Sequence, residues 1–262
     1  MVIILKFKIG DYVTRNSYKN DTIFKVINIS DNLYFLKGVD VRLFADSLEE
    51  DLVKVEVYSE NVNYIDKISD NMIDTRNDYF FLPGKILHID GDSDYLKRCL
   101  NFYKEAGLLA IGKKIDEENV HNEIIQLLKE YKPNILIITG HDAYYKKKGS
   151  KEDINNYKNS LNFVKSIKEA RKYESSHDKL IIISGACQSD YEELIKAGAN
   201  FASSPKRINI HALDPAIIAA SIALTEKNKE IDLIKLLEKT KYGYDGIGGI
   251  KTNGVMYVGF PR

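Results

Sequence analysis

Hydrophobic and polar positions alternate in short bursts through the first 57 residues of the chain. Turn-forming residues such as Gly10-Asp11 and Asp31-Asn32 separate the bursts. Alternation with a period of two between such turns is typical of antiparallel strands. The bursts cover residues 7–13, 22–29, 33–36, 39–43 and 52–57. This pattern predicts a small antiparallel β-barrel over residues 1–57.

A different pattern begins after residue 80. Apolar runs now alternate with stretches in which apolar residues recur about every 3.6 positions, which predicts strands separated by helices. The predicted strands are residues 85–90, 107–113, 134–140, 179–185 and 200–204. Alternating strands and helices indicate βαβ units, so we expect an α/β domain with a mostly parallel sheet over residues 81–262. The polar residues 58–80 are expected to form a linker.

Helices are predicted where apolar residues share one face of a helical turn. They cover residues 96–106, 120–131, 154–167, 190–197, 214–224 and 231–240. Asp214-Pro215 is a strong start signal, with an N-cap residue followed by proline at the first helical position. The tail VMYVGF predicts a last strand.

Composition limits the choice of partners. The length of 262 residues suits two domains. Lys and Arg together number 38, as do Asp and Glu, so no global field attracts nucleic acid or an anionic membrane. The start MVIILKFKIGDYV predicts a strand rather than a signal peptide. No apolar run approaches the roughly 20 residues that span a bilayer. We therefore expect a cytoplasmic protein that selects its partners through a site.

The cysteines and histidines give neither a disulfide framework nor a set of metal ligands, so no metal and no cofactor is predicted. Cys99 lies in an apolar helical stripe and is interpreted as a core residue. Among the histidines, His88 lies within a strand and is expected in the core, whereas His121 and His177 fall on polar segments. His211 precedes the helix start at Asp214.

Two of these residues stand at the ends of predicted parallel strands. Strand 134–140 is followed by His141, and strand 179–185 is followed by Ala186 and Cys187. In open α/β sheets, functional residues gather at the carboxyl ends of the strands. Because consecutive βαβ units place their strands side by side or one apart, we expect the imidazole and the thiol to lie close together.

An imidazole beside a thiol is the arrangement that cysteine nucleophiles need. A free thiol has a pKa of about 8.5 and is activated by a neighbouring imidazole or by a helix N-terminus. The predicted helix 190–197 would place its backbone N–H groups near Cys187, where they stabilise a thiolate and an oxyanion. His141 would act as general acid toward a leaving amine.

The same blocks carry a family resemblance. ILIITGHD and LIIISGACQS resemble the paired blocks of the caspase, clostripain and legumain group of cysteine peptidases, clan CD. ITGHD, HIDGDSDYL and the long block SGACQSDYEELIKAGANFASSPKRINIHALDPA resemble the YabG family of sporulation peptidases of endospore-forming bacteria, from the barrel to the C-terminus. The opening FKIGDYVTR resembles the first strands of SH3-like or Tudor-like barrels. Together these resemblances imply a caspase-like three-layer αβα domain behind a small barrel.

The resemblance also implies a biological role. It implies limited proteolysis of spore coat and germination proteins, cleavage after Arg, and self-cleavage. The protein would act first in the cytoplasm of the sporulating cell and then in the spore coat. Exposed loops of the barrel or linker are where a protease reaches, and Arg15, Arg42 and Arg76 lie there.

One feature departs from the clan pattern. In the wider clan a glycine follows the histidine and lends its N–H to the oxyanion hole, whereas here Gly140 precedes His141 and Asp142 follows it. The oxyanion donors are therefore expected among the backbone groups of Gly140 and Asp142. Alternatively, the Asp142 side chain orients His141, although adjacent residues of an extended chain usually point in opposite directions.

A preference for Arg requires a carboxylate in the pocket, because a guanidinium binds best to a bidentate acid. Asp90 and Asp92 follow the first strand of the α/β domain and are the nearest candidates. Asp214 is a third candidate, although a role in starting its helix would explain it without a substrate.

Two other interpretations stay open. Acidic residues after a first strand also suit a flavodoxin-like or receiver-like regulatory module that holds an ion or a phosphoryl group. The chain could also be a non-catalytic scaffold of the spore coat that interacts through its barrel. Cys187 distinguishes the peptidase from these two alternatives, because only a peptidase needs a nucleophile at this position.

Overall fold

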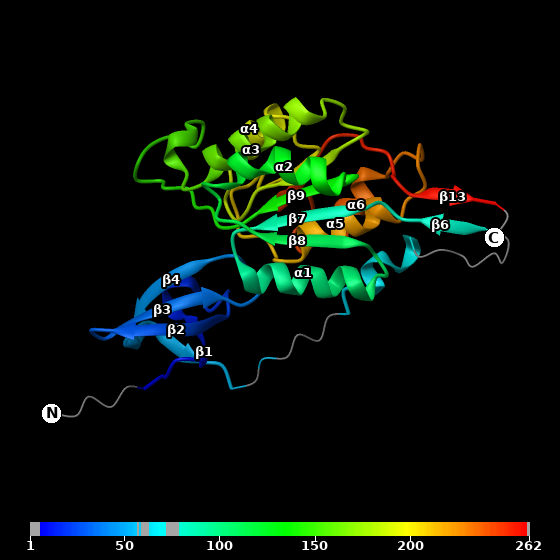
Figure 1. Ribbon diagram of the computed structural model, residues 1–262. Coiled ribbons are helices and arrows are strands. Elements are labelled where there is room, and N and C mark those ends of the chain that lie inside the picture. Colours follow the sequence, from blue (N-terminus) through cyan, green and yellow to red (C-terminus); the bar gives the residue numbers. More distant parts are fainter. Residues whose placement is uncertain (1–5, 57, 59–62, 72–78, 261–262) are drawn as a thin grey trace. The chain divides into compact units, whose positions relative to one another are not determined.

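The computed structural model describes residues 6–56, 58, 63–71 and 79–260. The chain divides into two compact units, residues 1–62 and 63–262. Each unit is described by itself below, and its elements are labelled in Figure 1. The predicted linker lies partly outside the described residues. Within its described part, residues 66–71 form a 3-10 helix, and Ile68 is buried in the core of the larger unit.

The smaller unit is a five-stranded antiparallel sheet. Its strands are β1 (Tyr12–Arg15), β2 (Phe24–Ser30), β3 (Leu33–Gly38), β4 (Phe44–Leu48) and β5 (Leu52–Lys54). They pair in the order β4-β3-β2-β1-β5. The apolar residues that alternate along them face one core, which includes Val13, Val26 and Leu36. The predicted antiparallel sheet is thus present, with short 3-10 helices at Asn16–Tyr18 and Glu49–Asp51.

The fourth strand differs from its prediction. Residues 39–43 form the turn before β4 rather than the strand itself. The N–H of Gly38 donates to the Leu43 carbonyl, and the N–H of Leu43 donates to the Val41 carbonyl. A Cβ on Gly38 would lie 2.3 Å from the Val41 carbonyl oxygen, so this turn requires glycine. Val41 is buried inside the turn, and an apolar residue is therefore present where the alternating pattern predicted a strand.

The larger unit is an α/β fold around a mixed, mostly parallel sheet. Its six strands are β7 (Ile86–Asp90), β8 (Ala110–Lys114), β9 (Ile135–Thr139), β10 (Ile181–Ser184), β11 (Phe201–Ser203) and β12 (Ile247–Gly249). The order is β12-β11-β10-β9-β7-β8, and only β12 runs antiparallel to its neighbour. The five strands predicted from the apolar runs are all present.

Helices cover both faces of this sheet, as Figure 1 shows. Helices α1 (Ser93–Glu105), α5 (Asp214–Ala223) and α6 (Leu233–Glu238) pack on one face, and α2 (Val120–Tyr131), α3 (Ser160–Tyr173) and α4 (Tyr191–Lys196) on the other. Strand residues alternate between the two cores: Ile135 and Ile137 face the first, Leu136 and Ile138 the second. Burial on both faces explains why these strands read as continuous apolar runs.

Two short strands and two 3-10 helices are further elements of the larger unit. Strand β13 (Tyr257–Gly259) pairs antiparallel with β6 (Phe80–Leu82), which confirms the predicted last strand. Two 3-10 helices cover Ile154–Asn156 and Gly243–Asp245. Helix α5 begins at Asp214 itself, one residue earlier than the N-cap assignment predicted. No helix among the described residues is both long and apolar enough to cross a membrane.

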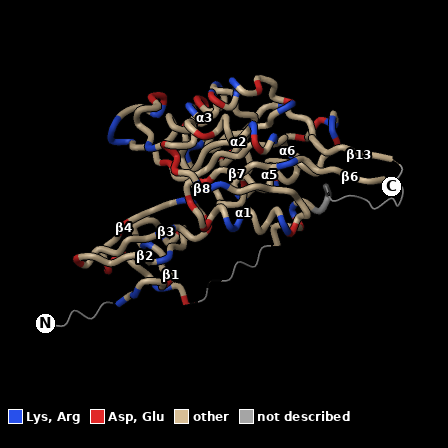
Figure 2. Tube along the Cα trace, viewed as in Figure 1, with Lys and Arg blue, Asp and Glu red and all other residues tan. Residues whose placement is uncertain are grey.

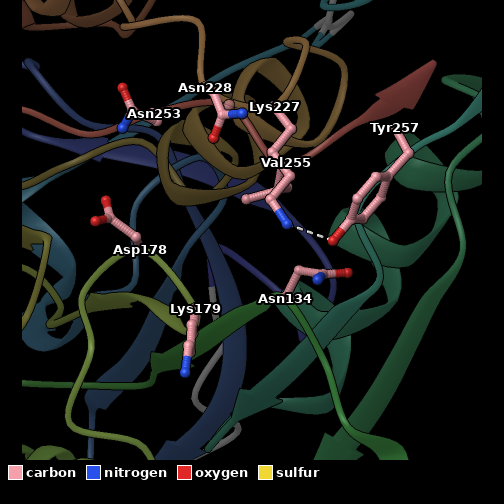
Figure 3. A pocket seen from close by; sticks show the side chains of 9 residues that line it. Asn134, Asp178, Lys179, Lys227, Asn228, Asn253, Val255 and Tyr257 are labelled. Atoms are coloured by element: carbon pink, nitrogen blue, oxygen red, sulfur yellow. Dashed lines mark hydrogen bonds between the residues drawn. The ribbon is translucent and has the colours of Figure 1, made fainter.

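The larger unit has a cavity at one end of its sheet, and neither unit has a segregated charge among its described residues. Acidic and basic residues are interspersed along both units in Figure 2, in agreement with the zero net charge. A cavity of about 340 Å³ opens beside Asn134 and Lys179, which precede β9 and β10. Figure 3 shows Lys227, Asn253 and Tyr257 around it. This cavity is at the amino ends of the strands, opposite the predicted catalytic pair.

Candidate active site

The two predicted catalytic residues follow adjacent strands. Strands β9 and β10 pair directly and in parallel, with Ile138 opposite Ser184. The N–H of Gly185 then donates to the Ile138 carbonyl at 3.1 Å, so the two chains are still side by side where the strands end. His141 lies in the loop after β9, and Cys187 lies in the loop after β10.

Cys187 lies beneath the loop that follows β11. Its side chain is fully buried. The N–H of Ile210 points at Sγ with a nitrogen–sulfur distance of 3.4 Å. Next to it, the N–H of Gln188 donates to the Ile208 carbonyl at 3.0 Å, and the Gln188 amide donates to Asn209 Oδ1 at 3.1 Å. The thiol in turn donates to the Ile210 carbonyl oxygen at 3.8 Å. The N–H group directed at sulfur favours the thiolate, the nucleophilic form of cysteine, whereas the carbonyl favours the thiol.

The predicted helix after Cys187 is present as α4. Its first turn is capped by the Asp190 carboxylate, which accepts from the N–H of Glu193 at 3.5 Å. The N–H group at the sulfur belongs to Ile210 of the β11–α5 loop rather than to this helix. The predicted donors were N–H groups of the helix that directly follows Cys187, whereas the observed N–H donor to sulfur lies 23 residues farther along the chain.

His141 stands between two carboxylates. Its Nδ1 is 3.6 Å from Glu117 Oε1, and its Nε2 is 3.7 Å from Asp92 Oδ2. The ring of Tyr95 lies 6.0 Å from the imidazole, centre to centre. The backbone N–H of His141 donates to Glu117 Oε1 at 2.6 Å. Burial favours the neutral acid, but the imidazole and this N–H outweigh burial, so the pKa of Glu117 is lowered.

Sequence reasoning missed Glu117. The residue lies just after β8, the parallel strand that pairs with β7 at the sheet edge. The rule that singled out His141 and Cys187, attention to the carboxyl ends of parallel strands, applies equally to this loop. Its acidic run, Asp116-Glu117-Glu118, was the available signal.

Asp142 joins the two strand-end loops. Its carboxylate accepts from Ser160 Oγ at 2.5 Å and from Ser189 Oγ at 2.9 Å, and Ser189 Oγ in turn accepts from the N–H of Ala186 at 2.9 Å. The N–H of Asn159 also donates to Asp142, at 2.7 Å. Burial raises the pKa of Asp142 despite these donors. The carboxylates beside the His141 ring are those of Glu117 and Asp92.

Comparison with known proteins identifies the family of the chain. The family pattern described as YabG peptidase U57 matches residues 8–261. The chain belongs to this family. A curated relative, the sporulation-specific protease YabG of Bacillus subtilis (strain 168), is 41% identical over 98% of this chain and 99% of its own length. The family resemblance stated from the sequence is therefore confirmed, and the chain is a member of a peptidase family.

The three acids considered for an Arg pocket have different surroundings in this YabG family member. Asp90 is fully buried and accepts from Thr139 Oγ1 at 2.8 Å and from the N–H of Asp92 at 2.9 Å. Asp214 is also buried, where it accepts from the N–H groups of His211 and Lys241. Burial raises the pKa of Asp214 to about 6.

Of the three acids considered for the Arg pocket, Asp92 is the one that lies beside His141. Its Oδ1 accepts from the N–H groups of Asp94 and Tyr95 and thereby caps α1. Its Oδ2 is the atom that faces His141. The side chain is 8% exposed, whereas Asp90 is 0% exposed. Of the three acids, Asp92 therefore combines access with proximity to the site.

The other cysteine and two further histidines have structural surroundings. Cys99 is fully buried in the core on the α1 face of the sheet, as predicted. His88 is buried between Tyr103 Oη at 3.0 Å and Thr139 Oγ1 at 2.9 Å. His211 is stacked on Tyr64. Among the described residues, no group of three or more His, Cys, Asp or Glu is arranged to hold a metal ion.

Proposed function

We propose that the chain is a cysteine endopeptidase in which Cys187 is the nucleophile and His141 the general acid and base. The observation that carries the proposal is the direct parallel pairing of β9 and β10, whose loops bear the two residues. Asp142 and Ser189 connect these loops, which supports a fixed geometry between imidazole and thiol. Membership of a peptidase family supports the reaction class.

The proposed reaction proceeds through an acyl-enzyme. The Cys187 thiolate attacks the scissile carbonyl carbon and forms a tetrahedral oxyanion, for which backbone N–H groups of Gly140 and Asp142 are the candidate donors. His141 carries the thiol proton to the leaving amine as the C–N bond breaks. A water molecule then gives a proton to His141 and attacks the thioester, which releases the carboxylate product and restores the thiol.

Access to sulfur requires the β11–α5 loop to move. Cys187 is buried beneath residues 208–210 and is hydrogen bonded to Ile210. A substrate carbonyl must approach within about 3–3.5 Å of the nucleophile. We infer that a substrate displaces this loop.

For cleavage after Arg, we propose Asp92 as the carboxylate that receives the guanidinium. Its partial exposure and its position beside His141 support this choice. Asp90 and Asp214 already use their oxygens in buried hydrogen bonds, which favours structural roles for both. An Asp92→Asn variant should lose its preference for Arg over a neutral residue.

The finer fold assignment is also a proposal. We infer a caspase-like arrangement for residues 81–262 and an SH3-like or Tudor-like barrel for residues 1–57, with residues 58–80 as linker. Helices on both faces of a mostly parallel sheet support the first, and the five-stranded antiparallel sheet supports the second.

One observation favours a second candidate function. Numbered from β7, the first five strands have the order 2-1-3-4-5, which flavodoxin-like and receiver domains share. Such a module would use acids after the first strand to hold an ion or a phosphoryl group. Here Asp90 is buried against Thr139, and Asp92 caps α1 and faces His141. This arrangement favours the peptidase.

The biological setting is inferred from the relative. Since that protein is named a sporulation-specific protease, we propose a sporulation protease that acts on spore coat and germination proteins and also cleaves itself. It would work in the sporulating cell and later in the coat. Of the three candidate self-cleavage positions, Arg42 is buried, Arg15 is on β1, and Arg76 lies outside the described residues.

The test compares matched variants of the purified protein. Wild type, Cys187→Ala and His141→Ala are incubated with peptides that differ only in Arg or Gln before the scissile bond, and Cys99→Ala is the control. We expect turnover of the Arg peptide by wild type and Cys99→Ala only. Full hydrolysis by Cys187→Ala would overturn the proposal. The same samples on a gel report self-cleavage.

A further inference from the structure

The Glu117 carboxylate occupies a space that two strand-end glycines leave open. Gly91 follows β7 and Gly140 follows β9. A Cβ on Gly140 would lie 2.2 Å from Glu117 Oε1, and a Cβ on Gly91 would lie 2.4 Å from the same atom. Neither glycine has a positive φ, so the backbone conformation does not require glycine at either position. A Cβ at either position would instead force the Glu117 carboxylate to move away.

The carboxylate in this space contacts His141 twice. Oε1 accepts the His141 backbone N–H at 2.6 Å and lies 3.6 Å from the ring nitrogen Nδ1. The Glu117 side chain is 14% exposed and the His141 side chain 11%. A carboxylate held this far from water interacts more strongly with an imidazole than an exposed one. One oxygen thus contacts both the backbone and the ring of the same residue.

We propose that Glu117 is a positioning residue of the peptidase, which holds the His141 imidazole in place through Nδ1 and through the backbone N–H. This inference rests on the proposed function of His141. It also explains the departure at Gly140: a glycine precedes the histidine because any side chain there would expel the Glu117 carboxylate. Asp92, which faces Nε2, differs from Glu117 because it caps α1, whereas the His141 backbone N–H donates to Glu117.

The first test changes the charge and keeps the shape. Glu117→Gln retains an oxygen for the His141 N–H but removes the negative charge, so kcat should fall about 100-fold with little change in KM. Glu117→Asp retains the charge on a shorter side chain and should recover part of the loss. Glu118→Gln is the matched control, since this exposed neighbour carries the same charge and should leave kcat unchanged.

The second test uses the glycine. Gly140→Ala should lower kcat in the wild-type background because the new Cβ expels the carboxylate. In the Glu117→Ala background the space is empty, so the same substitution should add little further loss. This non-additivity distinguishes a shared contact from two separate effects. Fully additive losses would contradict the inference.

The last test separates this inference from the proposed function. In the inactive Cys187→Ala protein, the nitrogen and proton resonances of the His141 ring are compared with and without Glu117→Gln. We expect Glu117→Gln to shift the Nδ1 resonance and Glu118→Gln to leave it in place. Unchanged resonances, or wild-type kcat in Glu117→Gln, would overturn the role of Glu117 while Cys187 remains essential. Hydrolysis that survives Cys187→Ala would instead overturn the peptidase assignment.

Discussion

Two histidines on neighbouring strands of one sheet have different surroundings. His88 lies inside β7, where Tyr103 and Thr139 contact both ring nitrogens at hydrogen-bond distance and Asp90 lies 3.7 Å away. His141 lies past the end of β9, where the nearest acids, Glu117 and Asp92, are 3.6 and 3.7 Å from its nitrogens. Both rings therefore have acid neighbours, but only His141 is beyond the end of a strand and beside the loop of a cysteine. The presence of a His–acid pair does not by itself identify a catalytic residue, and the position of His141 past a strand end is what supports our proposal for it.

The largest expected effect contrasts these two histidines. His141→Ala should lower turnover of an Arg peptide by about 1,000-fold, because general acid–base transfer supplies about 10²–10⁴-fold. Its free energy of unfolding should change little. His88→Ala should lower the free energy of unfolding by about 3 kcal/mol, since it removes the imidazole that contacts the buried Tyr103 and Thr139 hydroxyls and opens a cavity. Turnover per folded molecule should remain. Peptide assays measure turnover, and urea denaturation measures the free energy of unfolding. Loss of turnover in a fully folded His88→Ala protein would contradict the difference between the two histidines.

Asp142 tests whether the two loops act as one unit. Asp142→Asn keeps the shape of the side chain but replaces one acceptor oxygen by an amide that cannot accept from Ser160 and Ser189 together. We expect a loss of about 2 kcal/mol in the free energy of unfolding. Turnover should fall about 10-fold as the His141 and Cys187 loops separate. Denaturation and steady-state kinetics measure these effects. Asp21→Asn, at an exposed loop acid, is the control.

Sequence reasoning succeeded where the signal was local. Continuous apolar runs predicted the parallel strands, because burial on both faces leaves no polar positions in them. His141 and Cys187 lie past the ends of the paired strands β9 and β10, as predicted, and their catalytic role is our proposal. The pattern failed at residues 39–43, where buried Val41 belongs to a turn. It also failed to identify Ile210 and Glu117 as partners of the site, because both reach it through tertiary contacts that no local pattern records.

Asp214 is a buried acid that accepts from the backbone N–H of His211 rather than from its ring, and we assign it to structure together with His88. Burial raises the pKa of Asp214 to about 6, above its unfolded value near 3.8. A raised acid pKa stabilises the fold fully below the unfolded pKa, and this contribution is lost as the pH rises through the folded value. The free energy of unfolding should therefore fall by up to about 1.4 kcal/mol per pH unit between about pH 4 and 6. Asp214→Asn should flatten this fall in urea denaturation series. If the free energy of unfolding falls with pH equally in wild type and in Asp214→Asn, Asp214 is not the cause of the fall.

The smallest effect concerns the two cysteines. Cys99 and Cys187 are both fully buried, so burial alone does not tell them apart. Cys99 is within α1, and its sulfur lies 3.6 Å from the Ala212 carbonyl oxygen, which accepts from the thiol. The Cys187 thiol likewise donates to a carbonyl oxygen, that of Ile210 at 3.8 Å, but its sulfur also receives the N–H of Ile210, a donor that favours the thiolate. Cys99→Ala should lower the free energy of unfolding by about 1 kcal/mol. Turnover, and the loss of turnover on alkylation, should be the same as in wild type. Alkylation of the Cys99→Ala protein, followed by mass and activity, checks this; inactivation without modification of Cys187 would contradict the distinction between the two thiols.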